Sequence, residues 1–466
     1  MEAAGVIQNE QEAIHIYSNT TPQAGINDMG RIVFCLLLII MLATGCSSGA
    51  PGSGKLPPGA SSGGENSEQN TGQSGQGLPP LPSENTENAN SSNPASSPSD
   101  PVEQWLNKLS TEEKIGQMVL LGLEGTTPDE TVRSFIQDDH VGGFIFYKDN
   151  IRDVKQAQGL FNDLKQMNRE NAQVPLLLSV DEEGGKVSRM PQEIDSLPTA
   201  RKIGDAHSEE LARQIGGMLG RELADFGLNM NFAPVLDVNS NPDNPVIGNR
   251  AFGTKPDIVS QMGIAVMKGI REQGVIPVVK HFPGHGDTSV DSHLGLPVVE
   301  HDLTRLRDLE LIPFTRAVDE GADVVMIAHL LLPRLDSEHP ASFSQVIIHD
   351  LLRQELGFAG VVISDDMTMG AITEHYDIGE AAVQFIQAGG NIVLVGHDYD
   401  KGKQVLQAIR TAVEEGEIPP DMLNQRVYSI LELKRRYELD DEAAKGPDSV
   451  QMNKDIRKLL QEYQLK

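Results

Sequence analysis

The stretch Gly360-Val-Val-Ile-Ser-Asp-Asp-Met-Thr-Met369 begins as an unbroken apolar run and passes into two adjacent carboxylates. Similar apolar runs, each ending in a histidine, occur before it, in Asp323-Val-Val-Met-Ile-Ala-His329, and after it, in Asn391-Ile-Val-Leu-Val-Gly-His397. Short apolar runs without polar alternation favour strands covered on both faces, as in parallel sheets. We therefore expect three parallel strands whose polar side chains gather at one end.

Five further runs rich in Val, Ile and Leu precede these three, at residues 118–122, 143–147, 175–181, 230–237 and 276–281. Segments with apolar residues at helical spacing separate the runs, for example Leu211 and Ile215 after the N-cap candidate Ser208. Eight strands alternating with helices predict an α/β fold, a (β/α)8 TIM-type barrel that forms a single catalytic domain over residues 101–440. An open doubly wound sheet is the alternative. The charged tail, residues 441–466, is expected to pack as a helix or to fray.

The composition restricts the partners of the chain. Its 466 residues contain 38 Lys and Arg against 67 Asp and Glu, a formal net charge of −29, which repels nucleic acid and anionic lipid. Any membrane attachment must therefore be hydrophobic or covalent. The two cysteines, Cys35 and Cys46, both lie in one N-terminal apolar segment, so the remaining sequence offers no disulfide and no cysteine-based metal site.

That segment, residues 31–46, is too short for an ordinary membrane span of ~20 residues and is typical of a signal peptide. The small residues before Cys46 resemble a bacterial lipobox, in which the cysteine is acylated and becomes the mature N-terminus. We predict a leader over residues 1–45, with Met29 as the true translation start, and a lipid anchor on the extracytoplasmic face of the bacterial cell membrane. A short unprocessed membrane anchor is the alternative.

Residues 46–100 consist almost entirely of Ser, Gly, Pro, Asn, Glu and Gln, with very little to bury. Such a composition predicts a disordered N-terminal tether. A flexible chain of this length spans roughly 40 Å, enough to carry a domain from the membrane into the cell wall.

Ionisable side chains follow six of the predicted strands. Because active sites of (β/α)8 barrels form at the carboxyl ends of the strands, these side chains predict a polar pocket at that end. They are Asp181, Asp237, Lys280 with His281, His329, Asp365 and His397.

The stretch Lys280-His-Phe-Pro-Gly-His-Gly-Asp-Thr-Ser-Val-Asp-Ser-His293 is the most distinctive of the sequence. Asp291 and His293 stand two residues apart, so in an extended segment they point the same way and can share a hydrogen bond. A carboxylate beside an imidazole orients the ring and favours its protonated form, which suits a general acid. A contact that only stabilises the turn is the other interpretation.

Two more stretches carry acids at strand ends. Strand alternation sends Asp365 and Asp366 to opposite faces, so one of them is expected in the pocket, and spacing alone does not choose between them. The stretch 179–189, Ser-Val-Asp-Glu-Glu-Gly-Gly-Lys-Val-Ser-Arg, combines acids and glycines in a way that suits recognition of sugar hydroxyls.

Together these motifs resemble the β-N-acetylglucosaminidases (β-N-acetylhexosaminidases) of glycoside hydrolase family 3, over residues 102–439. The resemblance implies that Asp365, the first acid of Ser-Asp-Asp, is the nucleophile and that His293 is the acid/base, supported by Asp291. It also implies substrate-binding roles for five residues: Asp181, Arg189, Arg250, Lys280 and His281. Asp237 and His329 are expected behind these groups.

The resemblance implies a retaining, exo-acting hydrolase that removes terminal β-linked N-acetylglucosamine through a covalent glycosyl-aspartate. We expect no metal or other cofactor and a monomeric enzyme. GlcNAc-MurNAc fragments of peptidoglycan are the expected substrate, with chitin oligosaccharides as the alternative.

Three other functions fit parts of the sequence. Transfer of the sugar to phosphate would use the same site. A metal-dependent barrel hydrolase would draw ligands from His281, His285, His293, His329, Lys280 and Asp365. A non-catalytic sugar-binding lipoprotein would need the binding residues without Asp291, His293 and Asp365.

Overall fold

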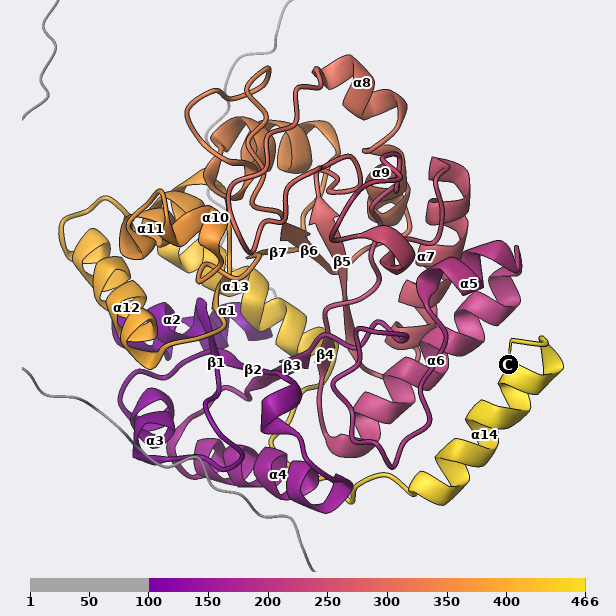
Figure 1. Ribbon diagram of the computed structural model, residues 1–466. Coiled ribbons are helices and arrows are strands. Elements are labelled where there is room, and N and C mark those ends of the chain that lie inside the picture. The colour runs from indigo at the N-terminus through magenta and orange to yellow at the C-terminus, as the bar shows by residue number, and fades with distance from the viewer. Residues whose placement is uncertain (1–99, 466) are drawn as a thin grey trace, which may run out of the picture. The chain divides into compact units, whose positions relative to one another are not determined.

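The structure, a computed structural model, describes residues 100–465. Eight parallel strands lie at the centre with helices around them (Figure 1). The strands are β1 (Val119–Gly122), β2 (Gly143–Phe146), β3 (Leu177–Val180), β4 (Met230–Asn231), β5 (Ile276–Phe282), β6 (Val324–Ile327), β7 (Val361–Ser364) and β8 (Val393–Val395). Each lies within or overlaps one of the eight predicted runs, and all their residues are buried.

The sheet closes on itself. Each strand from β1 to β7 pairs with its neighbour in sequence, and β8 returns to β1. Ile363 forms a parallel bridge with Ile392, and the Ser364 amide donates to the Ile392 carbonyl at 3.0 Å. A doubly wound sheet would instead reverse its strand order at a switch point. The TIM-type barrel is therefore confirmed as a nearly closed ring, and the open-sheet alternative is wrong.

The local sequence sets where the helices begin and end. Helix α6 begins after Ser208, whose side chain accepts a hydrogen bond from the Leu211 amide, and it ends at Gly227, which has a left-handed φ of 84°. The α-helices are α1 (Pro101–Leu106), α2 (Thr111–Gln117), α3 (Glu130–Gln137), α4 (Val154–Asn171), α5 (Ala200–Asp205), α6 (Glu209–Phe226), α7 (Pro256–Arg271), α8 (Leu303–Asp308), α9 (Ile312–Asp319), α10 (Gly370–Thr373), α11 (Ile378–Ala388), α12 (Tyr399–Glu414), α13 (Pro420–Arg436) and α14 (Ser449–Glu462), and a π-helix covers Val346–Glu355.

Helix α14 lies in the predicted charged tail and packs against the barrel. The Asp195 amide donates to the side chain of Asn453 at 2.8 Å, and Arg457 donates to the Asp195 carboxylate at 2.5 and 3.2 Å. Arg221 of α6 donates to Asp455 at 2.8 Å. The tail therefore packs as a helix and fastens the segment that follows the 179–189 stretch.

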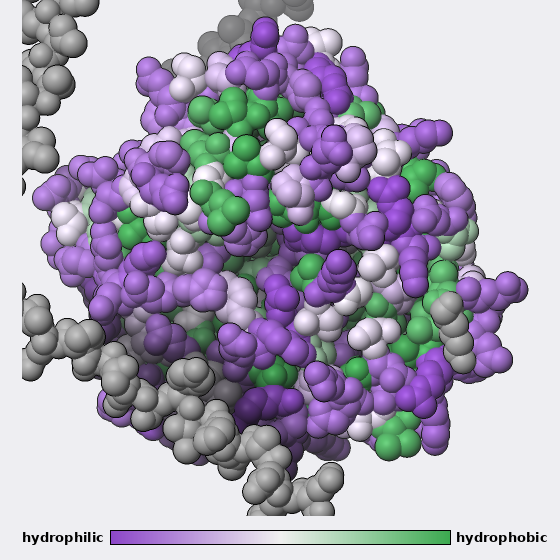
Figure 2. Space-filling model, in the orientation of Figure 1, coloured by the Kyte–Doolittle hydropathy of each residue, from purple (hydrophilic) through white to green (hydrophobic). Residues whose placement is uncertain are grey.

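The predictions on the leader, the Met29 start, acylated Cys46 and the tether lie outside the described residues, apart from residue 100. Within residues 100–465, no helix is long and apolar enough to cross a membrane. The face drawn in Figure 2 is mostly hydrophilic, with apolar side chains gathered in its upper part and a hollow near the middle.

Candidate active site

A cavity of about 500 Å³ lies at the carboxyl ends of the strands. Asp181 follows β3, Lys280 and His281 stand near the end of β5, and Asp365 follows β7. All eight side chains to which the sequence gave catalytic or binding roles line this cavity: Asp181, Arg189, Arg250, Lys280, His281, Asp291, His293 and Asp365. The structure therefore brings the predicted set together.

One side of the cavity is a network of alternating charges, centred on the buried side chains of Lys280 and Glu183. Lys280 Nζ donates to Asp181 Oδ1 at 2.6 Å and lies 2.8 Å from Glu183 Oε1. Arg250 grips the same Glu183 carboxylate with two hydrogen bonds, of 2.9 and 2.7 Å. Arg189 Nη2 lies 3.8 Å from Asp181 Oδ2. Because each cation faces a carboxylate, the groups are held in fixed positions before any ligand arrives.

Glu183 was not among the predicted site residues, although it stands in the Asp-Glu-Glu-Gly-Gly stretch. Burial alone would raise the pKa of its carboxyl, but Arg250 and Lys280 lower it far below the usual range. Burial likewise opposes the charge on Lys280, yet Asp181 and Glu183 raise its pKa. The sequence held one hint of this role. The stretch 179–189 contains more acidic than basic residues, so one of its carboxylates could have been expected to pair with a cation from another part of the chain.

His281 stands over Asp237, which is fully buried. His281 Nδ1 lies 2.7 Å from Asp237 Oδ2, and the His285 amide donates to Asp237 Oδ1 at 2.7 Å. The pairing of β5 with β6 shifts register between Val279 and Phe282. This irregularity lets the successive side chains of Lys280 and His281 both line the cavity. The expectation that Asp237 lies behind the lining is confirmed.

The expectation that a single acid of the Asp365–Asp366 pair enters the cavity is wrong, because both line it. Strand β7 ends at Ser364, so strand alternation no longer applies to them. The Asp366 carboxylate is engaged, since it accepts hydrogen bonds from the amides of Thr368 and Gly396 at 2.9 and 2.8 Å. The Asp365 carboxylate accepts one from the Asp366 amide at 2.8 Å.

Asp365 lies in a positive environment. Burial would raise the pKa of its carboxyl, but His281, His329, the Asp366 amide and Lys280 hold that pKa below its usual range. His329 is fully buried beneath it, and His329 Nε2 lies 3.1 Å from the Asp366 carbonyl oxygen. Asp365 is therefore ionised near neutral pH.

Asp291 and His293 stand on the long loop between β5 and α8. His293 Nδ1 lies 2.9 Å from Asp291 Oδ1, which also accepts a hydrogen bond from the His293 amide at 2.9 Å. The predicted contact is therefore present. The intervening Ser292 is buried, and its Oγ lies 3.1 Å from His285 Nε2. The pKa of His285 is lowered to about 4, mainly by burial, so this ring is neutral.

Tyr147 also lines the cavity, although the sequence gave it no role. Tyr147, which follows β2, stacks on His397 with ring centroids 4.4 Å apart, and its hydroxyl donates to Asp366 Oδ2 at 3.4 Å. Burial, followed by Asp366, raises the pKa of this tyrosine well above its usual value. Tyr147 closes a predicted strand, and no charged motif marked it.

The histidines considered for a metal-dependent hydrolase do not form a metal-ligand group. Within residues 100–465, such spacing is found for Asp287, His301 and Glu310, none of which lines the cavity. Carboxylates, cations and imidazoles around one barrel-mouth cavity instead define an enzyme that acts on a polar substrate.

Comparisons with known proteins identify the family. Residues 110–433 match the family described as "Glycosyl hydrolase family 3 N terminal domain". The beta-hexosaminidase of Nitrosomonas eutropha is 35% identical over 324 residues, which cover 68% of this chain and 91% of that protein. Beta-hexosaminidase A of Pseudoalteromonas piscicida is 33% identical over 334 residues, which cover 67% of this chain and 56% of that protein.

Among solved structures, a glycoside hydrolase family 3 beta-N-acetylglucosaminidase from Paenibacillus sp. str. FPU-7 aligns with a TM-score of 0.71 and 39% identity, over 75% of this chain and 68% of that one. The chain belongs to glycoside hydrolase family 3 and is a glycosidase. The resemblance seen in its motifs is confirmed, and the alternative of a non-catalytic binding protein is wrong.

Proposed function

We propose that the protein is an exo-acting, retaining β-N-acetylglucosaminidase, which removes a terminal non-reducing GlcNAc through a covalent glycosyl–Asp365 intermediate. The beta-hexosaminidase and beta-N-acetylglucosaminidase relatives support the sugar specificity. The observation that carries the proposal is that Asp365 and His293 line one cavity, the first fixed at the barrel rim and the second on a loop. A retaining glycosidase needs a nucleophile and a proton donor on one glycosidic bond.

Asp365 is the proposed nucleophile. Its lowered pKa keeps the carboxylate ionised, as attack on the anomeric carbon requires. In the first step, the carboxylate forms a bond to this carbon while the bond to the leaving oxygen breaks and His293 protonates that oxygen. In the second step, the neutral imidazole takes a proton from water, the water oxygen attacks the same carbon, and the Asp365 carboxylate is released.

Asp291 positions His293 for this work. Because Nδ1 of the ring faces the Asp291 carboxylate, Nε2 is the nitrogen directed to the substrate. Burial would raise the pKa of Asp291, but hydrogen bonds from the His293 amide and ring lower it. The carboxylate thus stays charged and stabilises the imidazolium.

Five side chains are proposed to hold the terminal sugar. Lys280 has three N–H donors, and Asp181 and Glu183 engage two of them, so one remains for a sugar hydroxyl. Asp181 offers acceptor oxygens, while Arg189, Arg250 and His281 contribute ring or guanidinium N–H groups. Because these side chains are already held in place by one another, little conformational entropy is lost when they bind the sugar hydroxyls.

The proposed natural substrate is GlcNAc-MurNAc material from peptidoglycan. It rests on the predicted acylation of Cys46, on the tether, and on the resulting position at the outer face of the membrane. The protein is proposed to act there as a lipid-anchored monomer.

An activity panel tests the proposal. We expect turnover of aryl β-GlcNAc and of GlcNAc-MurNAc peptides, and much slower turnover of aryl β-glucose, with the β-anomer of GlcNAc as first product by NMR. Phosphate should not change the rate, because Asp181 and Glu183 already balance the positive charge of Lys280 and Arg250. An α-anomer product would contradict retention, and GlcNAc-1-phosphate would show phosphorolysis.

A further inference from the structure

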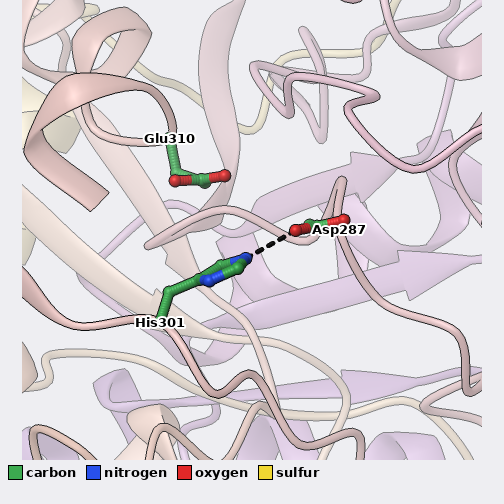
Figure 3. A group of neighbouring side chains, drawn as sticks. All are labelled: Asp287, His301 and Glu310. Carbon is green, nitrogen blue, oxygen red and sulfur yellow. Dashed lines mark hydrogen bonds and ion pairs between the residues drawn. The ribbon is translucent and has the colours of Figure 1, made fainter. Parts of the chain in front are cut away.

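A histidine and two carboxylates converge beside the loop that carries Asp291 and His293. Asp287 stands on the loop, His301 precedes α8, and Glu310 lies between α8 and α9. Their ligand atoms all lie within 4.8 Å of one another. Figure 3 shows Glu310 approaching from one side and the Asp287–His301 pair from the other. In the described part of the chain, this is the one group with such spacing.

The donor set matches zinc. One imidazole nitrogen and two carboxylate oxygens are ordinary zinc ligands, and three protein ligands leave a fourth position for water. Magnesium and calcium prefer oxygen ligands throughout, so the imidazole argues against them. His301 Nε2 lies 2.5 Å from Asp287 Oδ2, and this is the nitrogen that would turn to the metal.

Glu310 supplies a second, independent observation. It is 1% exposed, and its Oε1 accepts no well-aligned hydrogen bond from any described residue, although Arg305 Nη1 lies 3.1 Å away. A buried carboxylate oxygen without a well-aligned donor is costly, and a metal ion would engage it directly. The loop backbone passes close by, because a Cβ on Gly284 would lie 2.8 Å from Glu310 Cβ. Glycine at this position lets Glu310 reach its place.

Arg305 is the group that a cation must displace. It donates to Glu310 Oε2 at 3.2 Å, lies 3.1 Å from Oε1 and stands 3.7 Å from Asp287 Oδ2. Its side chain is 35% exposed, so it can turn toward solvent when a divalent ion takes over the two negative charges. A metal ion on His301 Nε2 replaces any proton on that nitrogen, and the proton leaves to solvent.

We propose that Asp287, His301 and Glu310 form a zinc site that ties the start of the Asp291–His293 loop to the α8–α9 segment. The ion takes no part in glycosidic cleavage. It adds a cross-link between the loop and the barrel wall.

Calorimetric titration of chelator-treated, full-length protein with zinc chloride tests the site. One zinc per chain is expected, together with a rise in the melting temperature. His301→Ala should weaken binding by more than about 10-fold, since loss of even an outer-shell partner costs 10 to 100-fold. The matched control is His349→Ala, because His349 Nδ1 lies 2.8 Å from Asp350 Oδ1 but belongs to no three-ligand group. That variant should bind as the parent does.

Two results would overturn the site. The first is full zinc binding by both His301→Ala and Asp287→Asn, the second variant keeping the test valid if the first fails to fold. The second is loss of binding in His293→Ala, which would place the ion on the catalytic pair instead. Retained binding in His293→Ala, with loss in His301→Ala or Asp287→Asn, supports the proposal.

Discussion

The two sides of the cavity are held in different ways. On the fixed side, Lys280 and Glu183 are 2% and 6% exposed, and each contacts two opposite charges. On the loop side, the His293 side chain is 65% exposed, and it pairs with Asp291, two residues away. The contrast indicates that the proposed sugar-binding groups are fixed by the barrel, whereas the proposed proton donor depends on the position of its loop.

The loop that carries Asp291 and His293 also exposes several large apolar side chains. Of the five large hydrophobic residues that are exposed among residues 100–465, three belong to it: Val290, Leu294 and Val298. Apolar area contributes ~25 cal/mol per Å² when it leaves water. Any movement that covers these side chains over a substrate is therefore favoured by the loop's own composition.

The largest expected effect comes from the fixed side. Asp365→Asn removes the proposed nucleophile while keeping its shape, and kcat on aryl β-GlcNAc should fall by about 10⁴-fold or more. The urea unfolding curve should stay close to that of the parent. Turnover within a few fold of the parent would refute the role of Asp365.

The loop side should respond differently. His293→Ala should lower kcat/KM by about 10² to 10⁴-fold on substrates with poor leaving groups. Activated aryl leaving groups need little protonation, so their first step should be spared and deglycosylation should limit the rate. A Brønsted plot across aryl leaving groups measures this difference. The same loss for every leaving group would rule out the acid role.

The barrel was predictable because its strands are continuous apolar runs, and Asp291 and His293 because their spacing brings two side chains together. Contacts between side chains far apart in the sequence could not be predicted. Glu183 meets Arg250 across 67 positions, and no local period connects them. The engaged carboxylate of Asp366 depends on the Gly396 amide, which belongs to the end of another strand. Such contacts come from closure of the ring rather than from local sequence.

Glu183→Gln tests how much the fixed side depends on charge balance. It leaves Lys280 and Arg250 short of a counter-charge and should lower the free energy of unfolding by about 3–5 kcal/mol near pH 7. Because the pKa of Glu183 is lowered in the folded protein, this contribution is present above the ordinary glutamate pKa of 4.5 and is lost as the pH falls below it. The parent and the variant should therefore converge in acid. Equal urea midpoints at pH 7 would show that the network adds no stability.

The smallest effect is expected from Glu222→Gln. Burial raises the pKa of Glu182 to about 7, and burial and Glu182 raise that of Glu222. A carboxyl whose pKa is raised by folding stabilises the protein fully below the ordinary glutamate pKa of 4.5, and that stability is lost as the pH rises through about 7. The parent should lose up to ~3 kcal/mol between about pH 5 and 8, and the variant less. Melting temperatures of the parent and the variant across this pH range measure the difference. Parallel pH profiles would show that Glu222 does not raise the pKa of Glu182.

Helix α14 links the end of the chain to the segment that follows the proposed sugar-binding residue Arg189. Its Arg457 and Asn453 form hydrogen bonds with Asp195, six positions after Arg189, so the segment beside the proposed sugar pocket is held by residues near the C-terminus. Proteolysis or a bulky fusion at that end would therefore reach the binding of substrate, although the site itself lies on the barrel rim. We therefore expect the affinity for the sugar to fall when helix α14 loses its contacts with Asp195.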